Sequence, residues 1–475
     1  MSSAIIIGAG PAGLALGMLL AEAGLHVTIL ERDIQEPPDT HEGAWEDWRR
    51  SGVAQFRQSH GLLPRGLQIL ESRFPRVVDH LRRSGAHSYN LTDSPPPSVA
   101  NWTPEPEDRQ FDSLAASRPV YELAFANAAK EMRIDVLRGT KVTGLTTGPT
   151  TISNVPHITG IVTDRGKSIR ADVVIDAGGR RSPMSAFLED VGAHRLPEAD
   201  GDFRFVYYTR YYRRTGRDFP SPYTLSRYLS GSVSIGTFPA DNDTWSVTLY
   251  GTNADKVLRS ARDPGVFERV IRAHPERAHF VDAEPITEVM TMAGVADRER
   301  TMHVDGTPTA TGWLPIADAW ACTNPILGRG ITMGLMHTVA LAPAITQTLD
   351  RPAELADAWE TITREQLRPW YVATRDIDRA RCKEMEAVRT GEITRHGERM
   401  SAQQAAFLAA ALTDPDVFRA QMELAAMLTT MDDLTARPEI QDKIAATARN
   451  LPDLPGQEIP TRAELEELLD IGDAH

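Results

Sequence analysis

The stretch GAGPAGLALG, residues 8–17, follows directly on an apolar run at residues 4–7. Its glycines have the spacing G-x-G-x-x-G, and an apolar segment continues to residue 23 before Gly24. Residues 3–7 predict a short buried strand, residues 14–23 a helix and residues 26–30 a second strand. This order of strand, glycine turn, helix and strand predicts a βαβ unit at the start of an α/β fold.

The three glycines and the acid that closes the second strand each have a physical role in binding a dinucleotide. Gly8 permits the tight turn, Gly10 lets a pyrophosphate approach bare backbone, and Gly13 lets the helix pack closely on the sheet. The start of the helix offers unpaired N–H groups and a partial positive charge to the phosphates. Glu31, about 20 residues after the glycines, can accept hydrogen bonds from the adenosine ribose. The alternative is a glycine-rich turn in an ordinary βαβ unit, and the motif alone does not separate NAD from FAD.

Composition and charge narrow the class of protein. The 475 residues carry a net charge of −14, which argues against nucleic acid or an anionic membrane as a partner because both would repel the chain. No uninterrupted apolar run approaches the ~20 residues of a membrane span, and the N-terminus lacks the order of a signal peptide. The two cysteines, Cys322 and Cys382, suit neither a disulfide framework nor a metal site, and the histidines show no metal-ligand spacing. We therefore expect a cytoplasmic protein without a metal that acts on a small molecule.

A second set of glycine turns lies far along the chain. Residues 171–176 predict a strand that runs into a glycine turn at residues 177–180. Further on, apolar residues from 312 predict a strand that ends in Asp318. A loop then precedes an apolar helix that extends to about residue 349, and it carries one proline and two glycines, Pro325, Gly328 and Gly330.

Together these motifs resemble those of the FAD-dependent monooxygenase superfamily of the para-hydroxybenzoate hydroxylase type, over about residues 1–350. The resemblance implies that the first glycine motif and Glu31 hold the ADP half of FAD. It also implies that Asp318 contacts the ribityl chain and that the loop of Pro325, Gly328 and Gly330 lies beside the isoalloxazine ring. N–H groups at the start of the following helix would stabilise negative charge on the reduced flavin.

Three arginines are further candidates for the cofactor site. Arg118 opens a helix, and the resemblance implies that it meets the flavin or its diphosphate; a solvated charge at a helix start is the alternative. Arg50 lies in the loop after the second strand and is expected to cap the flavin, while Arg32 directly follows Glu31. For His60, a structural role is as reasonable as a contact with the flavin.

The sequence departs from the family pattern in two places. Ala317 stands where the family usually has glycine, which costs little if the backbone φ there is negative. Residues 176–179 are a loose match to the Asp-Gly pair that follows the middle strand in the family.

The middle and end of the chain differ from the dinucleotide region. From residue 203 the pattern alternates with period two, which predicts an antiparallel sheet with strands at residues 203–212, 224–229, 232–238 and 244–250. In relatives such a sheet covers the substrate cavity, so Tyr207 and Tyr211 are candidates for its lining; simple packing of the sheet on helices is the alternative.

These patterns predict three structural units. A Rossmann-like FAD-binding domain is expected from residues 1–85, 110–190 and 295–350. A substrate domain with an inserted antiparallel sheet is expected from residues 86–109 and 191–294, and a helical C-terminal region from residues 351–475.

The resemblance implies oxygen chemistry on an organic substrate. NADPH or NADH, or a partner flavin reductase, would reduce FAD, and a C4a-hydroperoxide would deliver one oxygen atom in a hydroxylation or epoxidation. The middle segment is similar to polyketide-tailoring epoxidases and hydroxylases, which favours a natural-product substrate. The sequence names no catalytic acid or base: an epoxidation would need only the protonated peroxide, whereas a base would help to deprotonate an electron-rich aromatic substrate.

Three other functions are compatible with such a scaffold. A reductase of the geranylgeranyl-reductase type, or a cyclase, would use flavin without oxygen insertion. A flavin halogenase needs a W-x-W-x-I-P segment, and the corresponding strand offers only Trp245. A flavin-containing binding or sensor protein without turnover is the third.

Overall fold

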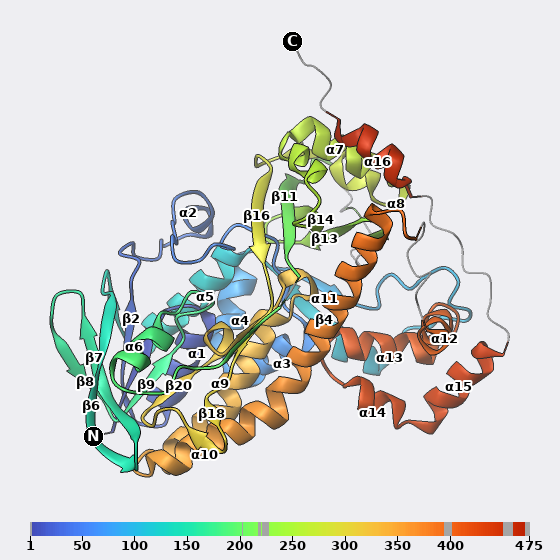
Figure 1. Cartoon of the computed structure of the whole chain (residues 1–475). Helices are drawn as coiled ribbons and strands as arrows, with labels where there is room; N and C mark the ends of the chain where they lie inside the picture. The colour runs from blue at the N-terminus through green and yellow to red at the C-terminus, as the bar shows by residue number, and fades with distance from the viewer. Residues whose placement is uncertain are drawn as a thin grey trace.

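A parallel sheet assembled from distant parts of the chain lies on the left of the molecule in Figure 1, where its strands β2, β9 and β20 are labelled. The computed structural model describes residues 2–201, 203–216, 220, 228–393, 401–449 and 459–470. The sheet has the order β20-β9-β1-β2-β5, and every neighbouring pair is parallel. Its strands are β1 (Ser3–Ile7), β2 (His26–Glu31), β5 (Asp135–Arg138), β9 (Val173–Asp176) and β20 (Trp313–Pro315). The α/β fold predicted from the first glycine motif is confirmed.

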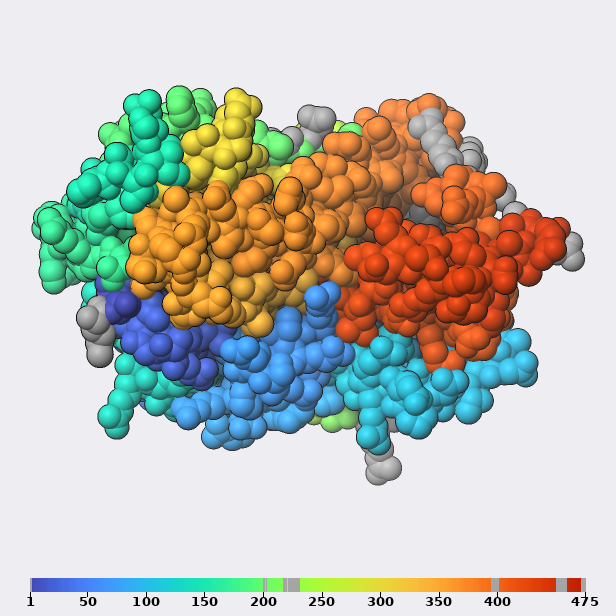
Figure 2. Space-filling view, turned by 90° about the horizontal axis from the view of Figure 1, so that it is seen from below, coloured from blue at the N-terminus to red at the C-terminus, as the bar shows by residue number. Residues whose placement is uncertain are grey.

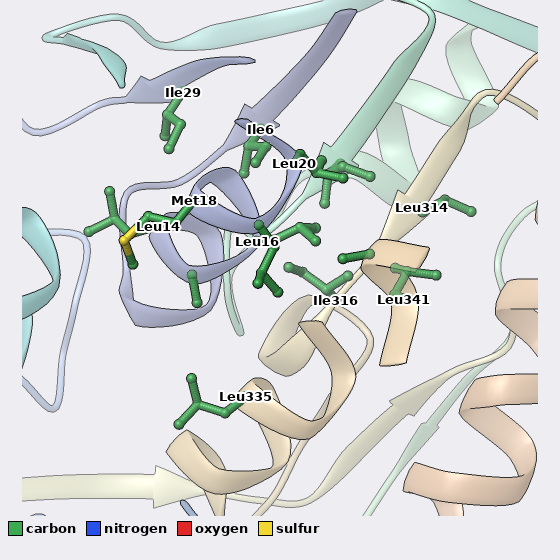
Figure 3. Packing of buried hydrophobic residues seen from close by; sticks show 14 of the residues in the cluster. Ile6, Leu14, Leu16, Met18, Leu20, Ile29, Leu314, Ile316, Leu335 and Leu341 are labelled. Atoms are coloured by element: carbon green, nitrogen blue, oxygen red, sulfur yellow. The ribbon is translucent and has the colours of Figure 1, made fainter. Parts of the chain in front are cut away.

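Two long apolar helices pack together against this sheet. They are α1 (Pro11–Glu22), which is buried along most of its length, and α9 (Arg329–Thr348). Figure 3 shows Leu14 and Leu16 of α1 in one core with Ile6 of β1 and Leu335 of α9. Further helices complete this layer: α3 (Pro64–Arg73), α4 (Pro75–Arg83), α5 (Arg118–Glu131) and α10 (Pro352–Ile362). Because α1 lies against α9, the start of the chain and residues 329–348 form one structural unit.

A small antiparallel sheet joins the parallel sheet through β9 and was not predicted from the sequence. It consists of β6 (Val142–Ile152), β7 (Val155–Thr163) and β8 (Ser168–Arg170). β6 contains two glycines and a proline, its pairing with β7 shifts register, and many of its side chains are exposed. Such a strand lacks the clean alternation of apolar and polar residues by which a strand is recognised.

A second, larger antiparallel sheet lies above the flavin-type fold in Figure 1. Its strands are β11 (Phe205–Arg213), β12 (Tyr228–Ser230), β13 (Val233–Pro239), β14 (Thr244–Thr252), β15 (Glu284–Pro285) and β16 (Met290–Val295). The strands predicted at residues 203–212, 232–238 and 244–250 are confirmed, and the one at residues 224–229 falls largely outside the described residues. One face of the sheet packs on α7 (Pro264–Arg272) and α16 (Arg462–Leu469), and the other face turns toward the loop before α9.

The end of the chain is helical, as predicted. After α11 (Arg368–Arg389) come α12 (Ala402–Ala411), α13 (Pro415–Ala425), α14 (Met431–Thr435) and α15 (Pro438–Ala448). Figure 2 shows these C-terminal helices lying against the segment near residue 110, where Arg419 Nε donates to Asp108 Oδ1 at 2.8 Å. Among the described residues, no helix is long and apolar enough to cross a bilayer.

The remaining short elements connect these layers. They are α2 (His41–Glu46), α6 (Met184–Asp190), α8 (Pro275–Ala278), β3 (His87–Asn90), β4 (Asp112–Ala115), β10 (Glu198–Asp200), β17 (Arg298–Arg300), β18 (His303–Val304), β19 (Thr307–Pro308) and β21 (Ala321–Cys322).

Candidate functional site

The glycine turn between β1 and α1 has the geometry of an anion site. Gly8 has φ +107°, and a Cβ at Gly13 would lie 2.1 Å from the Gly8 carbonyl oxygen, so both positions require glycine for the fold itself. Gly10 differs, because a Cβ there would meet no atom within 4 Å. Gly10 is also the N-cap of α1, and no side chain caps the helix. The free N–H groups therefore face open space beside Gly10, as phosphate binding requires.

A buried cluster of charges lies next to this turn. Arg50 Nη2 donates to Glu31 Oε2 at 2.7 Å, Arg50 Nε donates to Asp33 Oδ2 at 3.1 Å, and Arg50 Nη1 pairs with Glu122. Glu31 Oε2 also accepts from the Ala9 N–H at 3.0 Å, which ties the acid to the glycine turn. The side chains of these four charged residues are at most 7% exposed, so the ion pairs are little screened by water.

The charges in this cluster stabilise one another. Burial alone would lower the pKa of Arg50, but the carboxylates of Glu122, Glu31 and Asp33 raise it. Burial likewise opposes ionisation of Asp33, while hydrogen bonds from Ser51 and Arg50 lower its pKa. The cluster thus keeps Glu31 in place at the end of β2, where the ribose contact is expected. That contact, and the contact of Arg50 with the flavin, remain predictions.

Arg118 belongs to the same cluster through Glu122. It opens α5, as predicted, and its Nε donates to Glu122 Oε1 at 2.7 Å. Glu122 therefore bridges Arg118 and Arg50. The sequence analysis missed Glu122, although its position four residues after Arg118 on one helix is a usual spacing for an ion pair. Arg32 points elsewhere, and its Nη2 donates to the Gly52 carbonyl at 3.0 Å.

The turn that carries Asp318 differs in two respects from the expectation. The strand predicted to end in Asp318 ends at Pro315, and Asp318 lies in a short 3-10 turn, residues 317–319. The condition under which alanine would cost little at position 317, a negative φ, is not met, because the φ of Ala317 is +50°. The Ala317 N–H donates to Nδ1 of His337 on α9 at 3.4 Å, so a contact with a distant helix helps to hold the turn in the left-handed region.

Asp318 lies in a strongly basic neighbourhood. Burial raises the pKa of Asp318, and the charges of Arg180, Arg118 and Arg298 act in the opposite direction. Arg118 therefore acts on Asp318 as well as on Glu122, and it connects the two halves of the candidate site electrostatically. A small pocket beside this turn is lined by Ala317, Asp318, Trp320, Ala321, Thr323, Gly330, Met333 and His337.

The loop after this turn leads into α9 with its first N–H groups uncapped. Residues 325–327 form a 3-10 turn that begins at Pro325, and Gly328 at φ +66° is the N-cap of α9. No side chain caps the helix, and a Cβ at Gly330 would meet no atom within 4 Å. A Cβ at Gly334 would come within 3.4 Å of both the Ala12 and the Ala317 Cβ, so α1, the Asp318 turn and α9 meet closely there. The two uncapped helix starts thus belong to one site.

The antiparallel sheet brings aromatic residues to this loop. Ile326 and Leu327 pack in one apolar cluster with Phe205, Tyr207 and Tyr250. Tyr211, the other candidate for the substrate site, lies farther along β11, where its ring is 4.8 Å from Trp45 and its hydroxyl donates to the Gln58 carbonyl at 3.0 Å. Tyr207 thus lies in the apolar cluster that includes the loop before α9. The Tyr211 hydroxyl is instead already hydrogen-bonded within the protein.

His60 lies between the sheet and Arg118. Its Nδ1 is 2.9 Å from the Gln58 carbonyl oxygen, and burial together with the charge of Arg118 lowers its pKa to about 3. The imidazole is therefore neutral at physiological pH, and the Nδ1–H donates to the carbonyl.

The comparisons with known proteins agree with this geometry. Residues 1–368 match the FAD binding domain family. The chain belongs to the FAD-dependent monooxygenases of the para-hydroxybenzoate hydroxylase type. It is therefore an FAD-dependent oxidoreductase, as the glycine motifs predicted.

Curated relatives match about three quarters of the chain. It is 26% identical to the protein Rv3254 of Mycobacterium tuberculosis over an alignment of 366 residues that covers 72% of this chain and 72% of that protein. It is 25% identical to a 6-methylpretetramide 4-monooxygenase of Streptomyces rimosus over an alignment of 358 residues that covers 73% of this chain and 75% of that enzyme.

Solved structures show the same fold at low sequence identity. A flavoprotein/dehydrogenase from Cytophaga hutchinsonii has a TM-score of 0.63 at 17% identity, covering 94% of this chain and 98% of that one. The anhydrotetracycline hydroxylase OxyS from Streptomyces rimosus has a TM-score of 0.55 at 17% identity, covering 90% of this chain and 76% of that one.

Proposed function

We propose that this monooxygenase inserts one oxygen atom from O2 into a small apolar substrate of the natural-product type, by hydroxylation or epoxidation. The observation that carries the proposal is that Ile326 and Leu327, in the loop before α9, belong to one apolar cluster with Tyr207 and Tyr250 of the antiparallel sheet. This cluster brings an aromatic, buried surface to the loop where the isoalloxazine ring is expected.

The residues at the parallel sheet fit FAD. When bound, FAD takes up two electrons and activates O2. The uncapped N–H groups of α1 beside Gly10 would hold the diphosphate, and Glu31 would accept from the ribose. Asp318 would bind the ribityl hydroxyls, with Arg118 nearby to balance charge. The uncapped start of α9, near Pro325, Gly328 and Gly330, would stabilise negative charge on the ring edge.

The proposed reaction balances with one nicotinamide or its equivalent. NADPH or NADH supplies two electrons, directly or through a partner flavin reductase; one atom of O2 enters the substrate and the other leaves as water. Around the reacting centre, the buried sheet face and the loop at residues 325–328 exclude bulk water. A second Gly-x-Gly spacing, at Gly328 and Gly330, leads into α9 and α10 rather than into a strand, which supports its assignment to the flavin loop and not to a second dinucleotide motif.

The substrate class draws support from the relatives. One curated relative, 25% identical over most of its length, is named as a monooxygenase of 6-methylpretetramide. A polycyclic, largely apolar molecule would suit a site lined by aromatic rings.

Isotopically labelled O2 tests the proposal directly. The holoenzyme is incubated with NADPH, a flavin reductase, labelled O2 and either anhydrotetracycline or 6-methylpretetramide, and the products are examined by mass spectrometry. We expect a product that carries one labelled oxygen atom, with oxygen uptake that depends on the substrate. Conversion without oxygen, or a reduced product without label, would favour the flavin-dependent reductase or cyclase instead.

A further inference from the structure

Two tyrosines of the antiparallel sheet form a stacked pair above the flavin loop. Tyr207 on β11 is the direct cross-strand partner of Tyr250 on β14, and their ring centroids lie 5.5 Å apart at an angle of 23°. The same face of the sheet carries Gly236, where a Cβ would come within 3.6 Å of the Ile326 Cδ1. The pair therefore belongs to the face that meets the loop before α9, which is also the side along which α11 runs in Figure 1.

The hydroxyls of this pair have no hydrogen-bond partner among the described residues. Tyr207 is 2% exposed and Tyr250 is 0% exposed, so neither hydroxyl faces bulk solvent. Other buried tyrosines are satisfied: the hydroxyl of Tyr121 donates to the Leu114 carbonyl at 2.5 Å, and that of Tyr211 to the Gln58 carbonyl. A buried hydroxyl without a partner is costly and rare in folded proteins, so two side by side point to a ligand that supplies the acceptor.

Asn324, in the loop that faces the sheet, is also a buried polar side chain without a hydrogen-bond partner among the described residues. Asn324 precedes the Pro325 turn and is 1% exposed, and among the described residues neither its Nδ2 nor its Oδ1 has a partner. Its backbone N–H donates to Asp297 Oδ1 at 2.8 Å, which fixes the start of the loop. Polar atoms that lack partners thus occur on the sheet and on the flavin loop that faces it.

The charged residues near Tyr207 determine whether a neutral or an anionic oxygen of a ligand can bind there. Burial raises the pKa of Tyr207 well above its ordinary value, and the charges of Asp378 and Asp297 raise it further, although Arg180 acts in the opposite direction. Tyr207 is therefore a protonated donor at neutral pH. Nearby carboxylates that disfavour a phenolate also disfavour a substrate anion at the same place.

We propose that Tyr207 and Tyr250 are specificity residues whose hydroxyls donate together to one neutral oxygen, a carbonyl or an ether, of an aromatic substrate. A carbonyl or ether oxygen has two lone pairs, so it can accept one hydrogen bond, at about 2.7 Å, from each of two neighbouring hydroxyls. The inference rests on the proposed function only in placing the substrate at the flavin loop.

Three aromatic probes with the same number of heavy atoms test the proposal. Acetophenone carries a neutral carbonyl, cumene replaces the oxygen by a methyl group, and benzoate carries an anion. Binding to the oxidised holoenzyme is measured through perturbation of the flavin absorbance. We expect acetophenone to bind about five- to tenfold more tightly than cumene and benzoate to bind most weakly. Equal binding of acetophenone and cumene, tightest binding of benzoate, or no binding of acetophenone would overturn the proposal.

Substitutions test whether the hydroxyls of Tyr207 and Tyr250 are responsible for the preference for acetophenone. Tyr207→Phe and Tyr250→Phe should each weaken acetophenone about five- to tenfold and leave cumene unchanged. Tyr208→Phe is the matched control, since Tyr208 lies on the same strand but packs on the opposite face of the sheet, and it should change neither probe. An equal loss for acetophenone and cumene would mean that the tyrosines only shape the site, and would contradict the proposal.

Thermal stability provides a readout without any ligand. Removing a buried hydroxyl that has no partner should raise the melting temperature of the holoenzyme in Tyr207→Phe and Tyr250→Phe. Tyr211→Phe, which loses a hydrogen bond to Gln58, should lower it. A fall in all three variants would show that the pair is satisfied within the protein. Because neither measurement involves turnover, failure of oxygen insertion and failure of this inference are distinguishable.

Discussion

Arg50 and Glu31 form an ion pair inside the protein, with Arg50 Nη2 at 2.7 Å from Glu31 Oε2 and both side chains at most 5% exposed. Arg50 comes from the loop after β2, while Glu31 ends the strand and accepts from the Ala9 N–H of the glycine turn. The acid expected to bind the ribose is therefore held from both sides before any cofactor arrives. Such positioning reduces the ordering that binding must supply.

Replacing Arg50 with methionine should destabilise both the fold and the cofactor site. The change leaves Glu31 and Asp33 buried without their ion pair, which typically costs about 3–5 kcal/mol. We expect a lower free energy of unfolding in denaturant and weaker FAD binding. Arg49→Met is the control, because Arg49 is exposed and donates only to backbone carbonyls. Equal behaviour of the two variants would contradict the role assigned to Arg50.

The glycines of the first motif should respond differently to substitution. A Cβ at Gly10 would meet no protein atom within 4 Å, and the φ of −83° suits any residue, so the Gly10→Val apoprotein should fold with nearly unchanged stability but lose FAD. Gly13→Ala places a Cβ 2.1 Å from the Gly8 oxygen and should prevent stable folding. The flavin-to-protein ratio and the melting temperature of the apoproteins separate the two effects. A Gly10→Val protein that retains full flavin would refute the phosphate site.

Ala317→Gly should stabilise the protein. At φ +50° alanine is strained, and relief of that strain should exceed the extra chain entropy of glycine by on the order of 0.5 kcal/mol. Ala319→Gly, in the same turn but without a positive φ, should instead destabilise by about 0.5–1 kcal/mol. Unfolding in denaturant measures both, and a shift in the same direction for the two variants would remove the strain argument.

His337 should make the protein sensitive to acid. Burial lowers its pKa to about 3, below the value of about 6.5 in an unfolded chain. The unfolded state therefore binds the proton first, so the stability contributed by neutral His337 is fully present above pH 6.5 and is lost as the pH falls toward 3. In His337→Asn, the loss of unfolding free energy between pH 6 and pH 4 should be smaller by about 1.4 kcal/mol per pH unit. An unchanged slope would mean that His337 does not titrate as described.

Local patterns explain what could be predicted from the sequence. The βαβ unit with Gly8, Gly10 and Gly13 lies within one short segment, and each of its signals acts over a few residues. The start of α5 at Arg118 and the alternating strands of the large sheet were predictable for the same reason.

Contacts between distant residues explain what could not be predicted. Glu122 meets Arg50 across 72 positions in the sequence, and the pairing of Tyr207 with Tyr250 depends on strand register. The positive φ of Ala317 is tied to His337, 20 positions farther along the chain. In each pair the two residues lie too far apart in the sequence for a local pattern to reveal the contact. These contacts therefore become visible only in the folded structure.

The most direct test of oxygen insertion is to mix the reduced holoenzyme rapidly with oxygenated buffer, with and without anhydrotetracycline, and to follow the flavin absorbance. We expect the reduced flavin to react rapidly with O2 through a transient species whose spectrum differs from those of both the reduced and the oxidised flavin. A reduced flavin that persists in the presence of O2 under both conditions would contradict oxygen insertion and would favour a reductase.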